Sequence, residues 1–314
     1  MMRYALSKIL LMIPSLLLVS ALIFGLIRMI PGDPAEILLG DNLNPAALAS
    51  AREELGLDKA LPLQYLYWIK SVASGNLGVS FMTGEPVLSA LSERFVVTLQ
   101  VVVPAFLIAI AVALPAGLVA AYYHHRWIDR SIVLFATLCL SVPSFWMALL
   151  LIYLFGISHN WLPTGGFVSP AVDFLEGIRH LVLPVTALVF VEIAILTRMM
   201  RASAIEVLQQ DYITHARAKG VSEWRVLFLH TFPNAFAPSL TVIGLILGSL
   251  LSGTAVIETV FGLPGLGRFI VDAIYARDYP VVQGTLLFVV VVYLGVNLLV
   301  DMLYPLFDPR VRLS

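Results

Sequence analysis

Six long runs of apolar residues divide the sequence, and each approaches the length that a helix needs to cross a lipid bilayer. That length is about 20 mostly apolar residues. The runs cover residues 9–27, 95–123, 132–157, 181–197, 233–257 and 281–300. Their apolar residues are continuous rather than alternating, which favours helices over the strands of a barrel, the other structure that satisfies its backbone in lipid. The pattern therefore predicts an all-α polytopic membrane protein with six transmembrane helices.

The small share of charged residues supports a membrane protein. Only 12% of the 314 residues are charged, against roughly 25% in soluble domains. A net charge of −1 gives no reason to expect a nucleic-acid partner. The single cysteine, Cys139, lies in an apolar run and excludes an internal disulfide or a cysteine metal cluster. The run at 9–27 is longer than the roughly 7–15 residues of a signal-peptide core, so we expect it to be retained as the first span.

The cations predict the orientation. With the N-terminus in the cytoplasm, the inside collects Arg3, Lys8, Arg126, Arg130, Arg198, Arg201, Arg217, Lys219, Arg225, Arg310 and Arg312. The short outside loops hold only Arg179, Arg268 and Arg277. This asymmetry follows the positive-inside rule and predicts a multi-pass protein of a bacterial cytoplasmic (inner) membrane with both termini in the cytoplasm. The fourth run is the shortest and contains Glu192, but without it the cations after it would lie outside.

The segment from residue 31 to residue 94 lies outside in this orientation and carries its own helix signals. Asn44 followed by Pro45 indicates a helix start, and Gly56 closes that helix. We expect a second helix from Pro62 and a third from near Pro86 that leads into the second span. The second would carry Tyr65, Trp68 and Ile69 on one side. That stripe fits the membrane interface, packing within the chain, or another subunit.

The common catalytic motifs are absent. The chain has no G-x-x-x-x-G-K-[ST] loop, no H-E-x-x-H and no G-x-S-x-G, so we expect no catalytic residues. His124 and His125 are adjacent, and neighbouring helix residues face different ways, so we expect a solvated loop there and no metal site. We read the glycine-rich stretch at 262–267 as a tight turn leading into an amphipathic helix at 266–276.

Two features of the spans leave alternatives open. Glu192 lies well inside the fourth span, where it faces a polar conduit or accepts a hydrogen bond from a neighbour such as Thr241 or Asn297. One carboxylate is too few for a proton relay. Small residues four apart let helix backbones approach closely. The fifth span carries such residues at Gly244, Gly248, Ser252 and Gly253. Their face pairs with another helix of the chain, or meets an equivalent face on a second membrane subunit and lines the route between them.

Residues 212–233 form a polar segment between two apolar runs. Lipid cannot solvate Arg217, Lys219 and Arg225, so this segment must leave the bilayer. Its composition favours an ordered helix over a loop. We therefore expect a helix that docks onto another protein at the membrane face.

The same segment resembles the EAA loop of the membrane subunits of ATP-binding cassette (ABC) importers, written E-A-A, three residues, G, nine residues, I-x-L-P. Gly220 lies six residues after Thr214, and Pro233 lies thirteen residues after Gly220, as this spacing requires. The residues at 214–216 are T-H-A rather than E-A-A. The form Y-I-x-x-A-R-A-K-G is, however, typical of the peptide/nickel branch. Further stretches that resemble this branch are P-G-D-P-A at 31–35, E-L-G-L-D-K-A-L at 54–61, G-N-L-G-V-S at 75–80, P-G-L-G-R at 264–268, R-D-Y-P at 277–280 and D-P-R at 308–310.

The resemblance implies a B-type permease with the type I ABC importer fold. Residues 1–30 would be the tail and first span, 31–94 a helical extracytoplasmic insertion, and 95–314 a five-helix core that includes a coupling loop at 199–233. The implied partners are a homologous C-type permease, two cytoplasmic ATPases that bind ATP and Mg²⁺, an extracytoplasmic solute-binding protein and the lipid bilayer. The chain itself would bind no cofactor.

The resemblance also assigns a coupling helix to residues 211–221, which would enter a groove on an ATPase. The residues it assigns to this coupling are Asp211, Tyr212, Thr214, His215, Ala216, Arg217, Ala218, Lys219, Gly220 and Val221. Arg217 and Lys219 would meet acidic groove residues, and they also hold the loop inside through their charge. Gly220 would allow the turn that follows.

The substrate stays open among peptides, nickel or nickel chelates, and glutathione, and the breadth of the family favours peptides. A rival of another class is a self-sufficient secondary transporter or channel, which the scarcity of intramembrane carboxylates disfavours. An assembly or sensor scaffold without flux is a third.

Overall fold

The structure is a computed structural model that describes residues 2–30, 32–39 and 44–307, without the side chains of 2–7, 251–252 and 303–307. The described residues form helices and no β-strand, with one isolated bridge between Val79 and Pro86. The prediction of an all-α protein is confirmed. The chain folds into two compact units, one of residues 98–263 with the residues from 295 onward, the other of residues 2–97 and 264–294. The predicted ranges 1–30, 31–94 and 95–314 refer to position relative to a membrane and stay a prediction.

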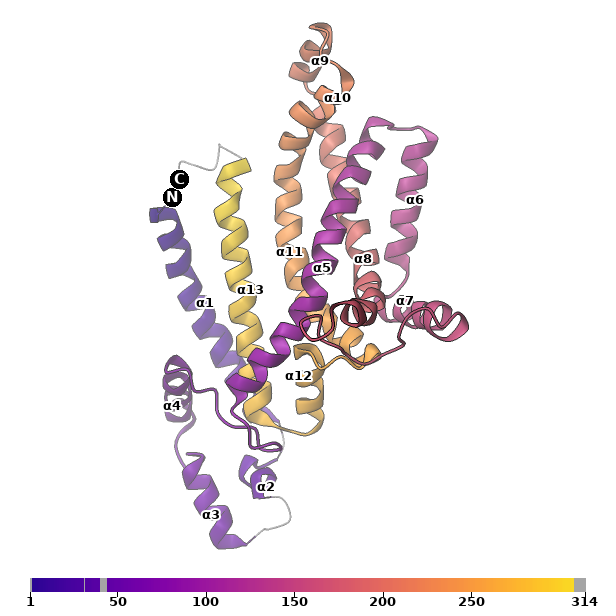
Figure 1. The fold of residues 1–314 in the computed structure, drawn as a ribbon. Helices are drawn as coiled ribbons and strands as arrows, with labels where there is room; N and C mark the ends of the chain where they lie inside the picture. Colours follow the sequence, from indigo (N-terminus) through magenta and orange to yellow (C-terminus); the bar gives the residue numbers. More distant parts are fainter. Residues whose placement is uncertain (1, 31, 40–43, 308–314) are drawn as a thin grey trace. The chain divides into compact units, whose positions relative to one another are not determined.

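The first unit is built around one long helix, α8, which packs against α6, α7 and α11 (Figure 1). Its elements are α5 (Val87–Tyr122) from residue 98 onward, α6 (Trp127–Ser141), α7 (Ser144–Leu151), the π-helix η1 (Ile152–Ser158), α8 (Phe174–Leu208), α9 (Asp211–Ala218), α10 (Glu223–Arg225), the π-helix η2 (Val226–Thr231), α11 (Phe232–Phe261) and the end of α13 (Tyr279–Phe307). Small residues bring the backbones close. A Cβ at Gly117 of α5 would lie 2.7 Å from the carbonyl oxygen of Thr197 on α8, so the two helix backbones can approach closely there only because residue 117 has no side chain.

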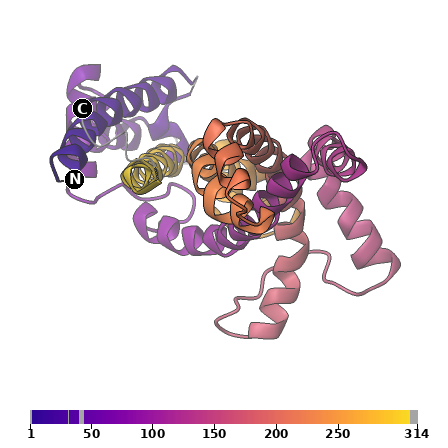
Figure 2. The same cartoon turned by 90° about the horizontal axis from the view of Figure 1, so that it is seen from above.

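The third predicted span is broken. A sharp bend of 96° separates α6 from the helix formed by α7 and η1, and Figure 2 shows the latter extending sideways from the end of α6. Val142 at the break is extended, with φ −101° and ψ 120°, because the ring of the following Pro143 disfavours a helical conformation there. The prediction of one continuous helix over 132–157 is therefore wrong.

The other spans form, with different ends from those predicted. In the described part of the chain, five helices are long and apolar enough to cross a membrane, or seven if two bent pairs each count as one span. The prediction of six lies within this range. The fourth span is much longer than 181–197, since α8 runs on in both directions past Arg179 and Arg198. The charged residues that flank the apolar run therefore belong to the same helix.

The second unit contains α1 (Met2–Met29), α2 (Pro34–Leu39), α3 (Pro45–Glu54), α4 (Leu61–Ala73), the start of α5, α12 (Leu266–Tyr275) and the start of α13. The predicted signals hold: the Asn44 side chain accepts the N–H of Ala46 at the start of α3, Gly56 follows its end with φ +64°, and α5 begins at Val87. The predicted amphipathic helix after the 262–267 turn is α12. The short helix α2 was not predicted.

The stripe on α4 packs within the chain. The Tyr65 and Trp68 rings lie 5.6 Å and 5.9 Å from that of Phe24 on α1. The Tyr65 hydroxyl lies 2.8 Å from the Ser20 hydroxyl. The sequence left open whether the stripe meets the membrane interface, the chain itself or another subunit. Tyr65 and Trp68 pack against the chain itself.

Asp278 joins two distant stretches of the second unit. The Ser80 hydroxyl donates to its Oδ2 at 2.5 Å, and the backbone N–H groups of Phe81 and Met82 donate to the same carboxylate at 3.2 Å and 3.4 Å. Asp278 is 3% exposed. The motif at 75–80 and the motif at 277–280 thus meet through one buried carboxylate.

Candidate functional site

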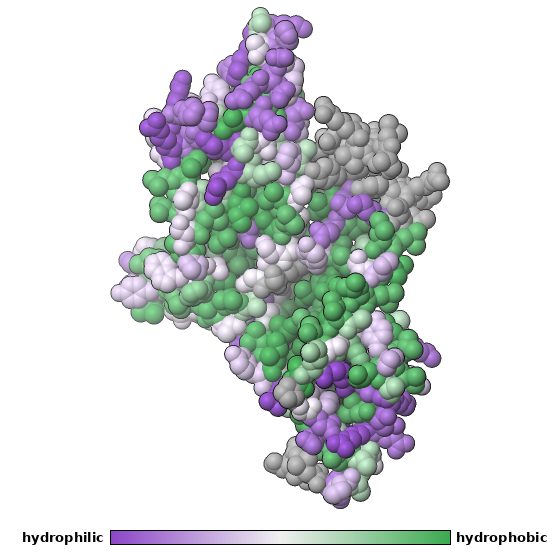
Figure 3. Space-filling model, turned by 180° about the vertical axis from the view of Figure 1, so that it is seen from behind, coloured by the Kyte–Doolittle hydropathy of each residue, from purple (hydrophilic) through white to green (hydrophobic). Residues whose placement is uncertain are grey.

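The polar segment after α8 forms a short helix outside the candidate spans. α8 ends at Leu208, α9 covers Asp211–Ala218, and the next candidate span begins at Glu223. Figure 1 shows α9 and α10 beyond the ends of α8 and α11, and Figure 3 shows hydrophilic side chains gathered at that end. The prediction of an ordered helix is confirmed for residues 211–218, whereas residues 223–233 of the predicted polar segment belong to the next candidate span. That the whole segment leaves the bilayer stays a prediction.

The local sequence explains where α9 begins and ends. Asp211 lies in its first turn, and His215 and Arg217 lie in its last, the arrangement that favours the helix dipole. At the end, the N–H of Gly220 donates to the Arg217 carbonyl at 2.9 Å, and that of Val221 donates to the Ala216 carbonyl at 3.2 Å. Gly220 has φ +77°, a conformation that glycine adopts without steric cost and that ends many helices. The helix is therefore shorter than the predicted 211–221, because residues 219–221 form this turn instead of continuing the helix.

One apolar residue and one ion pair fasten α9 to the chain that follows it. Ile213 is fully buried, as is Val226 of η2, and α9 packs against η2. The Arg217 Nε and Nη2 atoms donate to Glu223 Oε1 and Oε2 at 2.9 Å and 3.1 Å. The side chains of this pair are 40% and 44% exposed, so the pair contributes at most about 1 kcal/mol. Its paired geometry nevertheless fixes the direction of the loop.

Most residues predicted to couple to an ATPase face outward. Those exposed are Asp211, Tyr212, Thr214, His215, Arg217, Ala218, Lys219 and Gly220. Ala216 and Val221 are half-buried. Arg217 is held by Glu223, whereas the described part of the chain gives Lys219 no ion pair. Their roles in coupling stay a prediction.

Sequence reasoning missed four residues that build or extend this surface. Ile213 and Glu223 hold α9 in place, and no pattern in the sequence pointed to these contacts. Trp224 and Phe228 add aromatic surface, with ring centroids 4.3 Å apart and exposures of 70% and 44%. Trp224 and Phe228 could have been predicted as contact residues, because large aromatic side chains are unexpected in a segment that is otherwise polar.

A buried ion pair fixes the half of α8 that leads to α9. Arg201 on α8 donates from Nε and Nη2 to Asp129 at the start of α6, at 2.5 Å and 2.8 Å. The backbone N–H of His125 donates to the same carboxylate at 3.0 Å, and Nδ1 of His124 lies 3.3 Å from it. The sequence suggested for Arg201 only a role in orientation, and for His124 a solvated loop. The expected loop is present, since His124 and His125 lie in the turn between α5 and α6, and the side chains of Arg201 and His124 both contact the Asp129 carboxylate.

Glu192 lies between two helices of the first unit. It is 6% exposed, and the Ser249 hydroxyl on α11 donates to its Oε1 at 3.3 Å. A hydrogen bond from a neighbouring helix is thus present, with a donor other than the two suggested. Its Oε2 has no hydrogen-bond partner within the described residues. A second carboxylate, Glu258, is fully buried and accepts a hydrogen bond from Thr98 at 2.7 Å.

The small residues of α11 serve close packing at one position. A Cβ at Gly244 would lie 3.1 Å from a methyl carbon of Val300 on α13, so the close approach at Gly244 is made within the chain. Gly248 is half-buried. Ser252 lies in α11, but its side chain is outside the described part. Whether any of these residues lines a route stays a prediction.

Comparisons with known proteins agree with this architecture. Residues 113–313 match the family described as binding-protein-dependent transport system inner membrane component, and residues 1–102 match its N-terminal model. A putative peptide transport system permease protein of Brucella abortus (strain 2308) is 45% identical over 300 residues, covering 96% of each chain. The dipeptide transport system permease protein DppB of Escherichia coli (strain K12) is 39% identical over 336 residues, covering 99% of each. A DppB of Alkalihalophilus pseudofirmus is 36% identical, covering 99% of this chain and all of the relative.

Matches of this extent, on a helical chain with several candidate spans and a polar helix between two of them, establish the family. The chain belongs to the inner-membrane components of binding-protein-dependent transport systems, the permease subunits of ABC importers.

Proposed function

We propose that this permease forms half of the translocation pathway of an ATP-driven importer of short peptides. Its partners would be a homologous C-type permease, two cytoplasmic ATPases that hold ATP and Mg²⁺, and an extracytoplasmic solute-binding protein. Both termini and α9 would face the cytoplasm. The proposal extends the family membership, which implies a transporter subunit with no catalysis of its own.

The observation that carries the proposal is the construction of α9. A helix of eight residues is too short to be stable alone, yet α9 is held by the buried Ile213 and the Arg217–Glu223 pair, and it presents six of the predicted coupling residues outward, with two more in the turn that follows. It also joins two long apolar helices. Such an element transmits a push from a cytoplasmic partner to both helices at once.

The mechanism follows as alternating access. ATP binding closes the two ATPases, the docked α9 moves as a rigid lever, and the spans open toward a loaded binding protein. Hydrolysis then resets the cycle. A partner shifts such an equilibrium only by its different affinity for the two states, so α9 must hold the ATPase differently in each.

Peptides are the proposed substrate because the relatives in Brucella and Escherichia coli are named as permeases of peptide and dipeptide transport systems. A nickel-chelate or glutathione importer would share the same architecture. Calorimetry of the binding protein from the same gene cluster, with dipeptides, glutathione and Ni²⁺ in turn, distinguishes these substrates. We expect dipeptides to bind.

The test of the function is reconstitution in liposomes. We expect uptake of a labelled dipeptide only when both permeases, both ATPases, the binding protein and ATP are present. Omitting ATP or the ATPases should abolish uptake. Ion-gradient-driven uptake by this chain alone would instead establish a secondary transporter, and ATPase stimulation without any uptake would favour a scaffold.

A further inference from the structure

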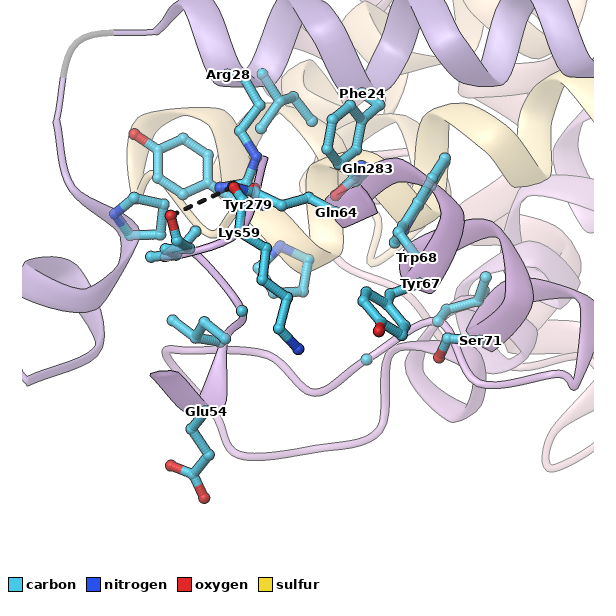
Figure 4. Close-up of a pocket in the computed structure, with 18 of the residues that line it drawn as sticks. Phe24, Arg28, Glu54, Lys59, Gln64, Tyr67, Trp68, Ser71, Tyr279 and Gln283 are labelled. Carbon is cyan, nitrogen blue, oxygen red and sulfur yellow. Dashed lines mark hydrogen bonds between the residues drawn. The ribbon is translucent and has the colours of Figure 1, made fainter. Parts of the chain in front are cut away.

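A cavity of about 450 Å³ lies within the second unit, between the end of α1, the α3–α4 turn, α4 and the start of α13 (Figure 4). Its volume falls in the range of small-molecule sites, roughly 300–1,000 Å³. All its lining residues belong to residues 24–81 and 279–283. None belongs to residues 211–221, which are predicted to couple to an ATPase.

Three polar atoms in the cavity lining are buried and lack a hydrogen-bond partner within the described residues. They are Oη of Tyr279, Nε2 of Gln283 and Oε1 of Gln64. Tyr279 as a whole is 6% exposed. Folded proteins rarely leave such atoms unpaired. Two of the three can donate a hydrogen bond and the third accepts one, so the lining offers both donors and an acceptor to a polar ligand.

Arg28 supplies a positive charge to the same lining. Its guanidinium lies 5.2 Å from the Phe24 ring centroid, and the described residues give it no hydrogen bond or ion pair. Asp33 is the nearby carboxylate, but its Oδ2 is held by Arg52 at 2.5 Å and its Oδ1 accepts the N–H of Ala35 at 2.9 Å. The guanidinium therefore keeps its donors available for another anion.

The remaining charges of the lining lie on its exposed side. Glu53, Glu54 and Lys59 are exposed, and Figure 4 shows the Glu54 side chain pointing away from Arg28, Gln64 and Tyr279. Lys59 lies over the Tyr67 ring, 4.5 Å from its centroid. Since Glu54 points away and Lys59 offsets part of the acidic charge, the carboxylates do not exclude an anion from the part of the cavity near Arg28.

Aromatic residues provide the apolar part of the cavity. Phe24, Tyr67, Trp68 and Phe81 line it together with Leu77, and Trp68 stands against Phe24, with ring centroids 5.9 Å apart. A cavity with a few convergent polar groups on an apolar wall is the usual form of a small-molecule site.

We propose that this cavity binds a small amphipathic molecule that carries an oxyanion next to an N–H donor. Arg28 pairs with the oxyanion, the side chains of Tyr279, Gln283 and Gln64 offer hydrogen bonds to the polar groups of the molecule, and the apolar part packs on the aromatic wall. Two sources share this chemistry. One is the C-terminal half of a short peptide, with its carboxylate and amide N–H. The other is the head group of phosphatidylethanolamine, with its phosphate and ammonium group.

The experiment uses the purified permease–ATPase complex in detergent, without the binding protein, and two probes. One arm measures binding of radiolabelled Ala-Phe by equilibrium dialysis, against Ala-Phe amide, which lacks the carboxylate. The other arm counts bound dioleoylphosphatidylethanolamine by native mass spectrometry, against dioleoylphosphatidylcholine, whose head group has no N–H. We expect one arm to show selective binding.

The variants test whether binding occurs at this cavity. Arg28→Gln should weaken the selective binding at least tenfold, which is about 1.4 kcal/mol. Lys70→Gln removes a charge from an exposed position of α4 that does not line the cavity and should change nothing. Tyr279→Phe keeps the ring and should weaken binding in the same arm. Absence of selective binding in both arms, or equal binding by the Arg28 and Lys70 variants, would overturn the proposal. Because binding is measured without transport, neither result decides whether the complex imports peptides.

Discussion

The buried pair between Asp129 and Arg201 offers a quantitative test of how the first unit is held together. The Asp129 side chain is 5% exposed and that of Arg201 is 24% exposed, and the two are joined by two hydrogen bonds. Removing one partner of a buried pair costs roughly 3–5 kcal/mol. In Arg201→Gln the carboxylate keeps the backbone N–H of His125, so we expect the lower end, about 3 kcal/mol.

This loss is large enough to measure by heating. At roughly 2–4 °C per kcal/mol for chains of this order of size, the midpoint for Arg201→Gln should fall by about 6–12 °C. The assay heats the purified complex and quantifies the surviving peak by size-exclusion chromatography. Arg198→Gln, three residues earlier at an exposed position of α8, removes the same charge and should stay within about 0.5 kcal/mol of the parent.

A double-mutant cycle with Asp129→Asn isolates the pair itself. We expect the double variant to lose less unfolding free energy than the two single variants lose together. The difference should be at least about 1 kcal/mol, within the range for residues in contact. If the two effects simply add, or if Arg201→Gln is as stable as Arg198→Gln, then the pair does not fix α8 and the reasoning is refuted.

Three further predictions concern single residues. Gly220→Val places a β-branched side chain at φ +77°, with a strain of about 1–2 kcal/mol, and should abolish uptake in cells while membrane levels stay normal. Gly220→Asn, which tolerates this conformation, should transport, and a transporting valine variant would refute the need for the turn. Asp278→Asn weakens the charge-assisted bond from Ser80, each such bond contributing about 1.5–3 kcal/mol, so limited proteolysis should cut the loop near residue 80 faster than in the parent; equal cleavage rates would contradict this. Glu192→Gln keeps an acceptor for Ser249 and should leave stability and uptake unchanged, since one carboxylate makes no proton relay; a loss of uptake would assign the charge a function.

The sequence was informative where a local rule decides the backbone. Asn44 before Pro45 marked the start of α3, and Gly220 marked the turn after α9, because capping and positive φ depend on one or two neighbouring residues. The break at Val142 had a local signal too, the following proline, but the continuous apolar run outweighed it. A run of apolar residues reports what lipid tolerates and says little about whether the helix stays straight.

Contacts between distant segments could not be predicted in this way. Ser80 and Asp278 are 198 residues apart in sequence, and Arg201 stood only as one of several cations. Such pairs depend on how the helices pack, which a single sequence does not encode locally. The same holds for the cavity, where the three polar atoms that have no partner among the described residues come from α4 and α13.

The central claim is that α9 docks on a cytoplasmic ATPase, and crosslinking in native membranes tests it most directly. Cys139, the chain's single cysteine, is first replaced by serine, and a new cysteine is introduced at the exposed position 215 (His215→Cys). A reagent that attaches to this thiol and carries a photoreactive group at its other end should then trap the ATPase subunit on illumination, whereas the same reagent on Lys70→Cys in the insertion should not. A position 215 that reacts only with an impermeant reagent added from the outer face would contradict the account.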